Sequence, residues 1–149
     1  MRIAIVHYHL RRGGVTRIIQ HAVSSLTGQG IEPLVMTGES VAAEHLDKRI
    51  RVIPSLAYDS PGNISLPDNI VRDLESSARE EWGALPDLWH IHNHSLGKNL
   101  AFPLAVHRMA RSGQHMLLQI HDFPEDGRPE NYRRLIRRTA QGDAQRLSQ

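Results

Sequence analysis

Six of the ten histidines in this 149-residue chain lie at or just beyond the ends of three short apolar segments. A free imidazole titrates near pH 6.5, which suits it to act as an acid, a base or a hydrogen-bonding group. If the three segments are neighbouring parallel strands, their carboxyl ends bring these histidines together in one crevice. A single histidine among them could instead be partly buried and satisfied by backbone groups. The six are His7, His9, His90, His92, His94 and His121.

The run 90–94, His-Ile-His-Asn-His, also permits a metal interpretation. Alternate residues of a strand point to one face, so two or three imidazoles could be offered to zinc. A hydrolytic zinc site normally adds carboxylates, however, and Asp122 is the one nearby candidate. His94 also lies past the predicted strand end, where the alternation has stopped. We therefore expect no metal here, and a metal-dependent hydrolase is the least favoured alternative.

Gly13 and Gly14 form a second candidate feature, at the turn from the first predicted strand to the first predicted helix. A glycine pair lets backbone N–H groups approach a ligand, and a helix amino end carries positive partial charge. Arg11, Arg12 and Arg17 add cationic charge. The segment lacks both the G-x-G-x-x-G dinucleotide pattern and the Gly-Lys-Ser/Thr phosphate loop. It favours binding of a phosphate or another anion, or a tight turn without a ligand.

Hydrophobic periodicity predicts the elements that position these residues. Five strands alternating with helices indicate an α/β protein, with a Rossmann-like, doubly wound parallel sheet and helices on both faces. We expect a strand order near 3-2-1-4-5, which places the ligand crevice between the first and fourth strands, and His92, His121 and Gly14 on its border. The predicted strands are 3–6, 34–36, 50–53, 88–92 and 116–121, and the predicted helices are 15–26, 40–46, 65–82 with Ser65 and Asp68 as a capping box, 99–111 and 132–140.

Composition excludes several classes of protein. Without cysteine, the chain has no disulfide, thiolate metal site or cysteine nucleophile. The formal net charge is only +2, and its excess lies after Pro124, so we expect no nucleic-acid partner. The opening apolar run is too short for a signal sequence or a membrane span, and we expect a cytoplasmic protein. The length predicts one domain over residues 1–140, followed by a polar tail, 141–149.

The basic run from Arg133 to Arg138 reads Arg-Arg-Leu-Ile-Arg-Arg. A run of this kind is usually the solvated face of an amphipathic helix. The alternative is an interface with an anionic membrane surface or with a missing partner domain, because basic amphipathic helices bind acidic lipid.

Three motifs together resemble the amino-terminal domain of GT-B glycosyltransferases of the family 4, or group 1, type. They are Arg-Arg-Gly-Gly-Val-Thr-Arg at 11–17, Pro-Asp-Leu-Trp-His-Ile-His-Asn-His at 86–94, and His-Asp-Phe at 121–123 ahead of Glu-Asp-Gly-Arg-Pro at 125–129. The resemblance covers nearly the whole chain. It implies a retaining transfer of a sugar from a nucleotide-sugar to a sugar, lipid or small-molecule acceptor, without a metal or cofactor, in which this domain mostly binds the acceptor.

The resemblance also implies roles for single residues. His121 matches the histidine that hydrogen-bonds the donor sugar or assists at the reacting centre. Gly13 and Gly14 would face the donor diphosphate or the acceptor, and Asn93 and His94 would line the acceptor side. The predicted site thus has His121 as its catalytic residue and the substrate-binding residues Gly13, Gly14, Arg17, His92, Asn93, His94 and Asp122.

One departure from the family is large, because its carboxyl-terminal nucleotide-sugar domain has no counterpart in this sequence. We expect an incomplete amino-terminal domain that needs such a domain, or a second polypeptide, for activity. The alternative is a stand-alone module that binds a phosphate or a sugar in the same crevice without catalysis.

Overall fold

A computed structural model describes residues 1–31, 33–40, 49–62 and 64–147. Its centre is a five-stranded, fully parallel sheet with the order β3-β2-β1-β4-β5, which confirms the predicted fold class and strand order. The strands are β1 (Ile3–His7), β2 (Leu34–Thr37), β3 (Ile50–Val52), β4 (Leu88–His92) and β5 (Met116–Gln119).

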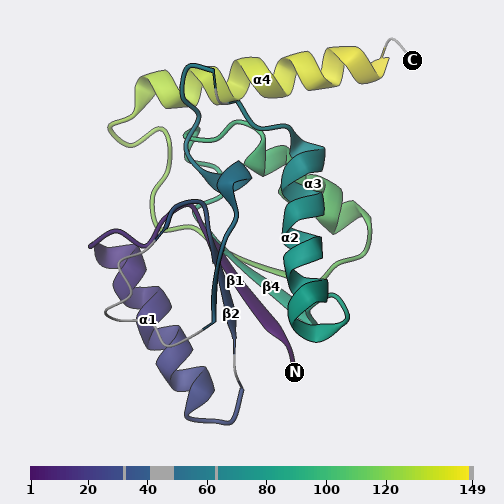
Figure 1. Ribbon diagram of the computed structural model, residues 1–149. Helices are drawn as coiled ribbons and strands as arrows, with labels where there is room; N and C mark the ends of the chain where they lie inside the picture. Colours follow the sequence, from purple (N-terminus) through teal and green to yellow (C-terminus); the bar gives the residue numbers. More distant parts are fainter. Residues whose placement is uncertain (32, 41–48, 63, 148–149) are drawn as a thin grey trace.

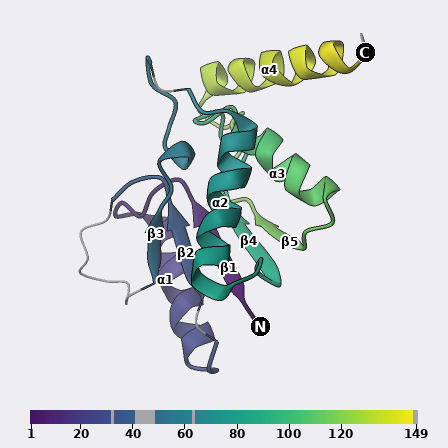
Figure 2. The same cartoon turned by 45° about the vertical axis from the view of Figure 1, so that its right-hand side comes forward.

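Helices cover both faces of the sheet (Figures 1 and 2). One face packs against α1, and the opposite face packs against α2 and α3. A fourth helix, α4, lies across the end of the molecule toward which the strands point (Figure 1). Among the described residues, no helix is long and apolar enough to cross a membrane. The helices are α1 (Gly14–Thr27), α2 (Pro67–Trp82), α3 (Phe102–Arg111) and α4 (Pro129–Leu147), with a short 3-10 helix, η1 (Pro54–Leu56), before α2.

Side-chain alternation along the central strands explains the position of the histidines. In β1, Ala4 and Val6 face the core under α2 and α3, whereas Ile3 and Ile5 face α1. Successive strand residues point to opposite faces, so the next residue on the α1 side is His7. The same alternation in β4 buries Trp89 and Ile91 under α2 and α3 and leaves Leu88, His90 and His92 on the α1 side.

Helix boundaries differ from the predicted ones for local reasons. The predicted capping box is wrong, because α2 begins at Pro67 after Leu66, and no side chain caps it. Proline at the first helical turn needs no amide partner and supplies a preorganised φ. The start of α3 moves from 99 to Phe102, since the Asn99 side-chain oxygen accepts hydrogen bonds from the amides of Ala101 and Phe102, both at 3.1 Å.

The last helix starts earlier than predicted, at Pro129 instead of residue 132. The helix α4 continues to Leu147 instead of ending at residue 140. The helix expected over 40–46 lies, apart from Ser40, outside the described residues.

Gly97 fixes how closely α4 approaches the domain, and Gly97→Ala tests this contact. Its φ is +67°, and an added Cβ would lie 2.5 Å from the carbonyl oxygen of Asn131 in α4. We expect the variant to weaken the docking of α4, measured as faster amide hydrogen exchange in the helix. Gly113→Ala is the matched control, since φ is +82° there but a Cβ meets nothing within 4 Å. Both variants should share a conformational cost of about 1–2 kcal/mol. Equal protection of α4 in the two variants would contradict the docking role of Gly97.

Candidate functional site

A cavity of about 190 Å³ lies at the carboxyl ends of the central strands. Its walls come from the β1–α1 turn, the loop after β4 and the loop after β5, with Tyr58 contributed by the segment before α2. The cavity therefore occupies the point between β1 and β4 where the strand order reverses, the usual ligand position in such sheets. Its lining residues are His7, His9, Arg11, Arg12, Gly13, Gly14, Val15, Thr16, Tyr58, Asn93, Leu96, Asp122 and Arg128.

The amino end of α1 opens into this cavity without a side-chain cap. Its first turn contains no acidic residue. The Thr16 hydroxyl donates to the carbonyl oxygen of Arg11 at 2.5 Å, so it stabilises the turn and does not cap the helix amides. The first amides of a helix have no partner within the helix and carry positive partial charge. This end of α1 therefore favours an anion.

Arginine side chains add cationic charge to the cavity, to different degrees. Arg11 is held by Glu39 through two hydrogen bonds of 2.6 and 2.8 Å, so most of its charge is compensated. Arg12 and Arg128 make no ion pair with any described residue, and Asp122 is the one acidic residue in the lining. The sequence contains Arg128 within the resemblance, but nothing in its spacing indicated that it would reach the β1–α1 turn.

Three of the histidines form a connected row on the α1 side of the sheet. His7 Nδ1 donates to the carbonyl oxygen of His92 at 3.3 Å, and His92 Nδ1 lies 2.8 Å from His121 Nε2. The rings of His92 and His121 are within 3° of parallel. Beside them, His90 Nε2 donates to the side-chain oxygen of Gln119 at 2.8 Å. Thus β4 and the loop after β5 hold His92 and His121 as a hydrogen-bonded pair.

Burial keeps the inner members of this row neutral. Desolvation lowers the pKa of His7 to about 4. Desolvation and, to a smaller extent, the neighbouring imidazoles lower the pKa of His92 to about 3. A neutral imidazole has one donor and one acceptor nitrogen. His92 Nε2 is buried without a partner, so a lone pair there avoids an orphaned donor. His92 Nδ1 then donates to His121 Nε2, which leaves His121 Nδ1 as the N–H available to a ligand.

Asn93 joins the loops after β4 and β5. Its side-chain oxygen accepts hydrogen bonds from the amides of His121 at 2.7 Å and Asp122 at 3.2 Å. Its side-chain amide donates to Asp122 Oδ2 at 3.1 Å. These bonds draw the backbone away from the sheet, so β5 ends at Gln119 instead of continuing to residue 121 as the sequence predicted. Asn93 lines the cavity, but its carboxamide is already engaged in positioning its neighbours.

The predicted site residues divide into two adjacent groups. The cavity lining contains Gly13, Gly14, Asn93 and Asp122 but not His92 or His121. The shared crevice expected for His92, His121 and Gly14 stays a prediction, because the histidine pair lies beside the cavity and His92 contacts its lining residue His7.

Two predicted binding residues lie outside the cavity lining. Arg17 is exposed on α1. His94 accepts a hydrogen bond from the Tyr8 hydroxyl through its carbonyl oxygen at 2.8 Å, and its ring does not line the cavity. No group of three or more potential metal ligands occurs among the residues with described positions. Sequence reasoning missed Tyr58, whose hydroxyl lies 2.9 Å from His9 Nε2, since its segment carried only loop signals.

Comparisons with known proteins connect the chain to one enzyme. It is 31% identical over 143 residues to mannosylglucosyl-3-phosphoglycerate synthase from Petrotoga mobilis (strain DSM 10674 / SJ95). The match covers 86% of this chain and 27% of that protein, so the chain spans about a quarter of the relative's length. No family model matches the chain, and no solved structure matches it significantly. The chain is thus a distant homologue of a glycosyltransferase.

The buried histidines predict a stability that depends on pH. Below pH 6.5 the unfolded chain protonates His7 and His92, whereas the folded chain keeps them neutral until about pH 4 and 3. The unfolded state then binds more protons, so the free energy of unfolding should fall by up to about 1.4 kcal/mol per pH unit for each histidine as the pH drops from 6.5 to 4.

Thermal melting between pH 7 and 4 measures this effect. His92→Asn removes one titrating group, so its melting temperature should depend less on pH than that of the unmodified chain. His107→Asn alters an exposed histidine and serves as the control. The assignment fails if the unmodified chain melts independently of pH, or if the two variants have the same pH slope.

Proposed function

We propose that this chain is the acceptor-binding half of a retaining glycosyltransferase of the GT-B family 4 type, which transfers a sugar from a nucleotide-sugar to an acceptor. The observation that carries the proposal is the cationic cavity at the amino end of α1, at the reversal of strand order. The homology to a glycosyltransferase supports this class of reaction. The nucleotide-binding half would come from a carboxyl-terminal domain or from a second polypeptide.

The donor diphosphate or an acidic group of the acceptor is the anion that would fit this cavity. Backbone amides at Gly13 and Gly14 would donate hydrogen bonds to it, as helix amino ends do for phosphates. Arg12 and Arg128 would compensate its charge, because neither is paired with a described acidic group. Arg11 contributes less, since Glu39 already binds its guanidinium. The two free arginines thus mark the side from which the diphosphate would be bound.

His121 would act on the donor sugar. In a retaining transfer, positive charge develops at the anomeric carbon while the leaving diphosphate gains negative charge, and hydrogen bonds placed in advance lower the barrier. His121 Nδ1–H would donate to a hydroxyl of the donor sugar or assist at the reacting centre. His92 is then a positioning residue, because its 2.8 Å hydrogen bond fixes the ring and tautomer of His121.

The acceptor is expected to be anionic. The name of the Petrotoga mobilis relative describes a phosphoglycerate that bears glucose and mannose. A sugar-bearing or small-molecule acceptor with a phosphate or carboxylate would suit the cationic surroundings of the cavity in this chain. We expect no metal ion and no organic cofactor in the reaction, and no nucleic-acid partner.

A stand-alone binding module remains a second candidate, since the cavity is built wholly from this chain. Binding of nucleotide-sugars separates the two candidates. We expect residues 1–149 alone to bind common nucleotide-sugars weakly or not at all, because half of the donor contacts would be supplied by the other domain. Isothermal titration calorimetry is the measurement. A micromolar dissociation constant would mean that the chain holds its own nucleotide site, and would favour the module.

His121→Ala tests the catalytic assignment, with transfer assayed while the nucleotide-binding half is present. We expect the turnover to fall by about a hundredfold or more, the usual scale for losing a positioned acid, base or transition-state hydrogen bond. His107→Ala removes an exposed histidine on α3 and should leave turnover unchanged. Full activity of His121→Ala would overturn the role of His121.

A further inference from the structure

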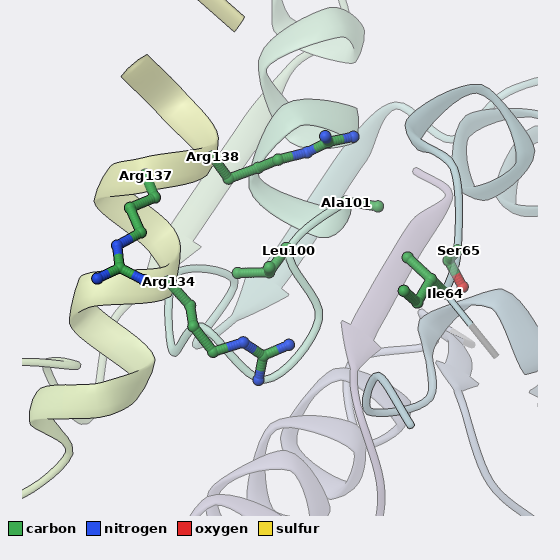
Figure 3. A pocket seen from close by; sticks show the side chains of 7 residues that line it. All are labelled: Ile64, Ser65, Leu100, Ala101, Arg134, Arg137 and Arg138. Atoms are coloured by element: carbon green, nitrogen blue, oxygen red, sulfur yellow. The ribbon is translucent and has the colours of Figure 1, made fainter. Parts of the chain in front are cut away.

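A second and larger cavity, of about 320 Å³, lies between α4 and the amino ends of α2 and α3. In Figure 3, Arg134 and Arg138 extend from α4 toward the segment that carries Ile64 and Ser65, and Leu100 and Ala101 lie between. Arg137 also belongs to the lining, although its guanidinium turns to the other side of the helix in this view. Arg133, Arg137 and Arg138 are exposed, as expected for a solvated helix face, whereas Arg134 is half-buried.

The charges around this cavity are poorly compensated. Arg134 lies 3.7 Å from Asp59 Oδ2, whose side chain is buried. Arg137 and Arg138 form no ion pair with any described residue, and no acidic side chain lines the cavity. Like charges gathered in a concave space repel one another and concentrate positive potential there. A bound anion would relieve this repulsion.

The cationic groups are also arranged for one ligand. Arg134 and Arg138 are four residues apart on a helix, so they lie on the same face, one turn from each other. Two guanidinium groups at this spacing can share the oxygens of one phosphate, which arginine binds through paired N–H donors.

The other wall of the cavity is apolar. Leu100 and Ala101 form part of it, and Ile64 leaves 72% of its surface exposed at the opening. An inorganic ion would leave this apolar surface in water, whereas an organic group attached to the anion would cover it. The combination suits a phosphate ester better than free phosphate.

The second cavity is separate from the first but adjacent to it. Tyr58 lines the first cavity, and the next residue, Asp59, accepts a hydrogen bond from the amide of Leu100 at 2.9 Å while it faces Arg134. Tyr58 thus lines the first cavity, while its neighbour Asp59 contacts Arg134 of the second. Arg134 is partly compensated by Asp59, whereas Arg138 extends into the second cavity and forms no ion pair with a described residue.

We propose that the second cavity is a binding site for a phosphate ester. Arg134 and Arg138 hold the phosphate, Arg137 adds charge, and Leu100 and Ile64 cover the organic part. This inference does not depend on the glycosyltransferase proposal, because it concerns binding at residues that the donor site does not use. The phosphate ester is either a soluble metabolite or the headgroup of an anionic lipid, and the experiment below distinguishes these sources.

The test uses residues 1–149 and two probes. Calorimetric titration measures binding of sn-glycerol 3-phosphate, and sedimentation measures binding to phosphatidylcholine vesicles with and without phosphatidic acid. The double variant Arg137→Gln/Arg138→Gln should weaken binding of the effective probe by about tenfold or more, because each charge-assisted hydrogen bond lost is worth roughly that factor. Arg134 is left intact, since it contacts Asp59.

Two controls separate the cavity from net charge and from the first cavity. Arg72→Gln/Arg133→Gln removes the same charge from two exposed arginines outside the cavity and should retain binding. Arg12→Gln alters the first cavity and should also retain it. Circular dichroism of every variant checks that the fold is intact.

The binding results distinguish the two sources of the ligand and can overturn the proposal. Glycerol phosphate binding that depends on Arg137 and Arg138 supports a soluble ligand, and binding only to vesicles with phosphatidic acid supports a lipid headgroup. The proposal is overturned if neither probe binds, or if the Arg72/Arg133 control loses as much binding as the cavity variant. Neither of these failures bears on nucleotide-sugar binding at the first cavity, which is measured separately.

Discussion

The hydrogen bonds of the Asn93 carboxamide hold together the two loops on which the candidate site depends. Asn93 adopts a left-handed backbone, with φ at 52°, and is 2% exposed. Asparagine tolerates this conformation better than most residues. In this conformation the side-chain oxygen of Asn93 accepts hydrogen bonds from the amides of His121 and Asp122, and β5 ends before them. These bonds hold Asp122 in the cavity, while the hydrogen bond to His92 keeps His121 beside it.

The placement of imidazoles on a sheet face has an energetic consequence. A face of a parallel sheet is normally covered by apolar residues, as Ile3 and Ile5 are by α1. His7 and His92 continue this face and are equally buried, so they must exist as neutral rings with satisfied donors. Neutral histidines are hydrogen-bonding groups at ordinary pH. The row of histidines is therefore better suited to orient a reacting group through hydrogen bonds than to carry a positive charge.

The sequence predicted the sheet more completely than the site. Strand order follows from apolar runs separated by helical periods, since right-handed crossovers leave few arrangements. The cavity depends instead on contacts between residues far apart in the chain. Arg128 reaches it from a loop that turns at Gly127, with φ at 69°, and Tyr58 reaches it by meeting His9. Local sequence patterns do not predict such long-range contacts, because they depend on the geometry of the loops.

Both cavities combine one arginine paired with a carboxylate and further arginines without such a pair, although different elements form the two cavities. In each, one arginine is held by a carboxylate, Arg11 by Glu39 and Arg134 by Asp59. These two ion pairs compensate Arg11 and Arg134 only. The other arginines of the two cavities form no such pair with a described residue. A surface ion pair contributes at most about 1 kcal/mol to stability, so the unpaired arginines are not explained by folding. Their charge is available to ligands.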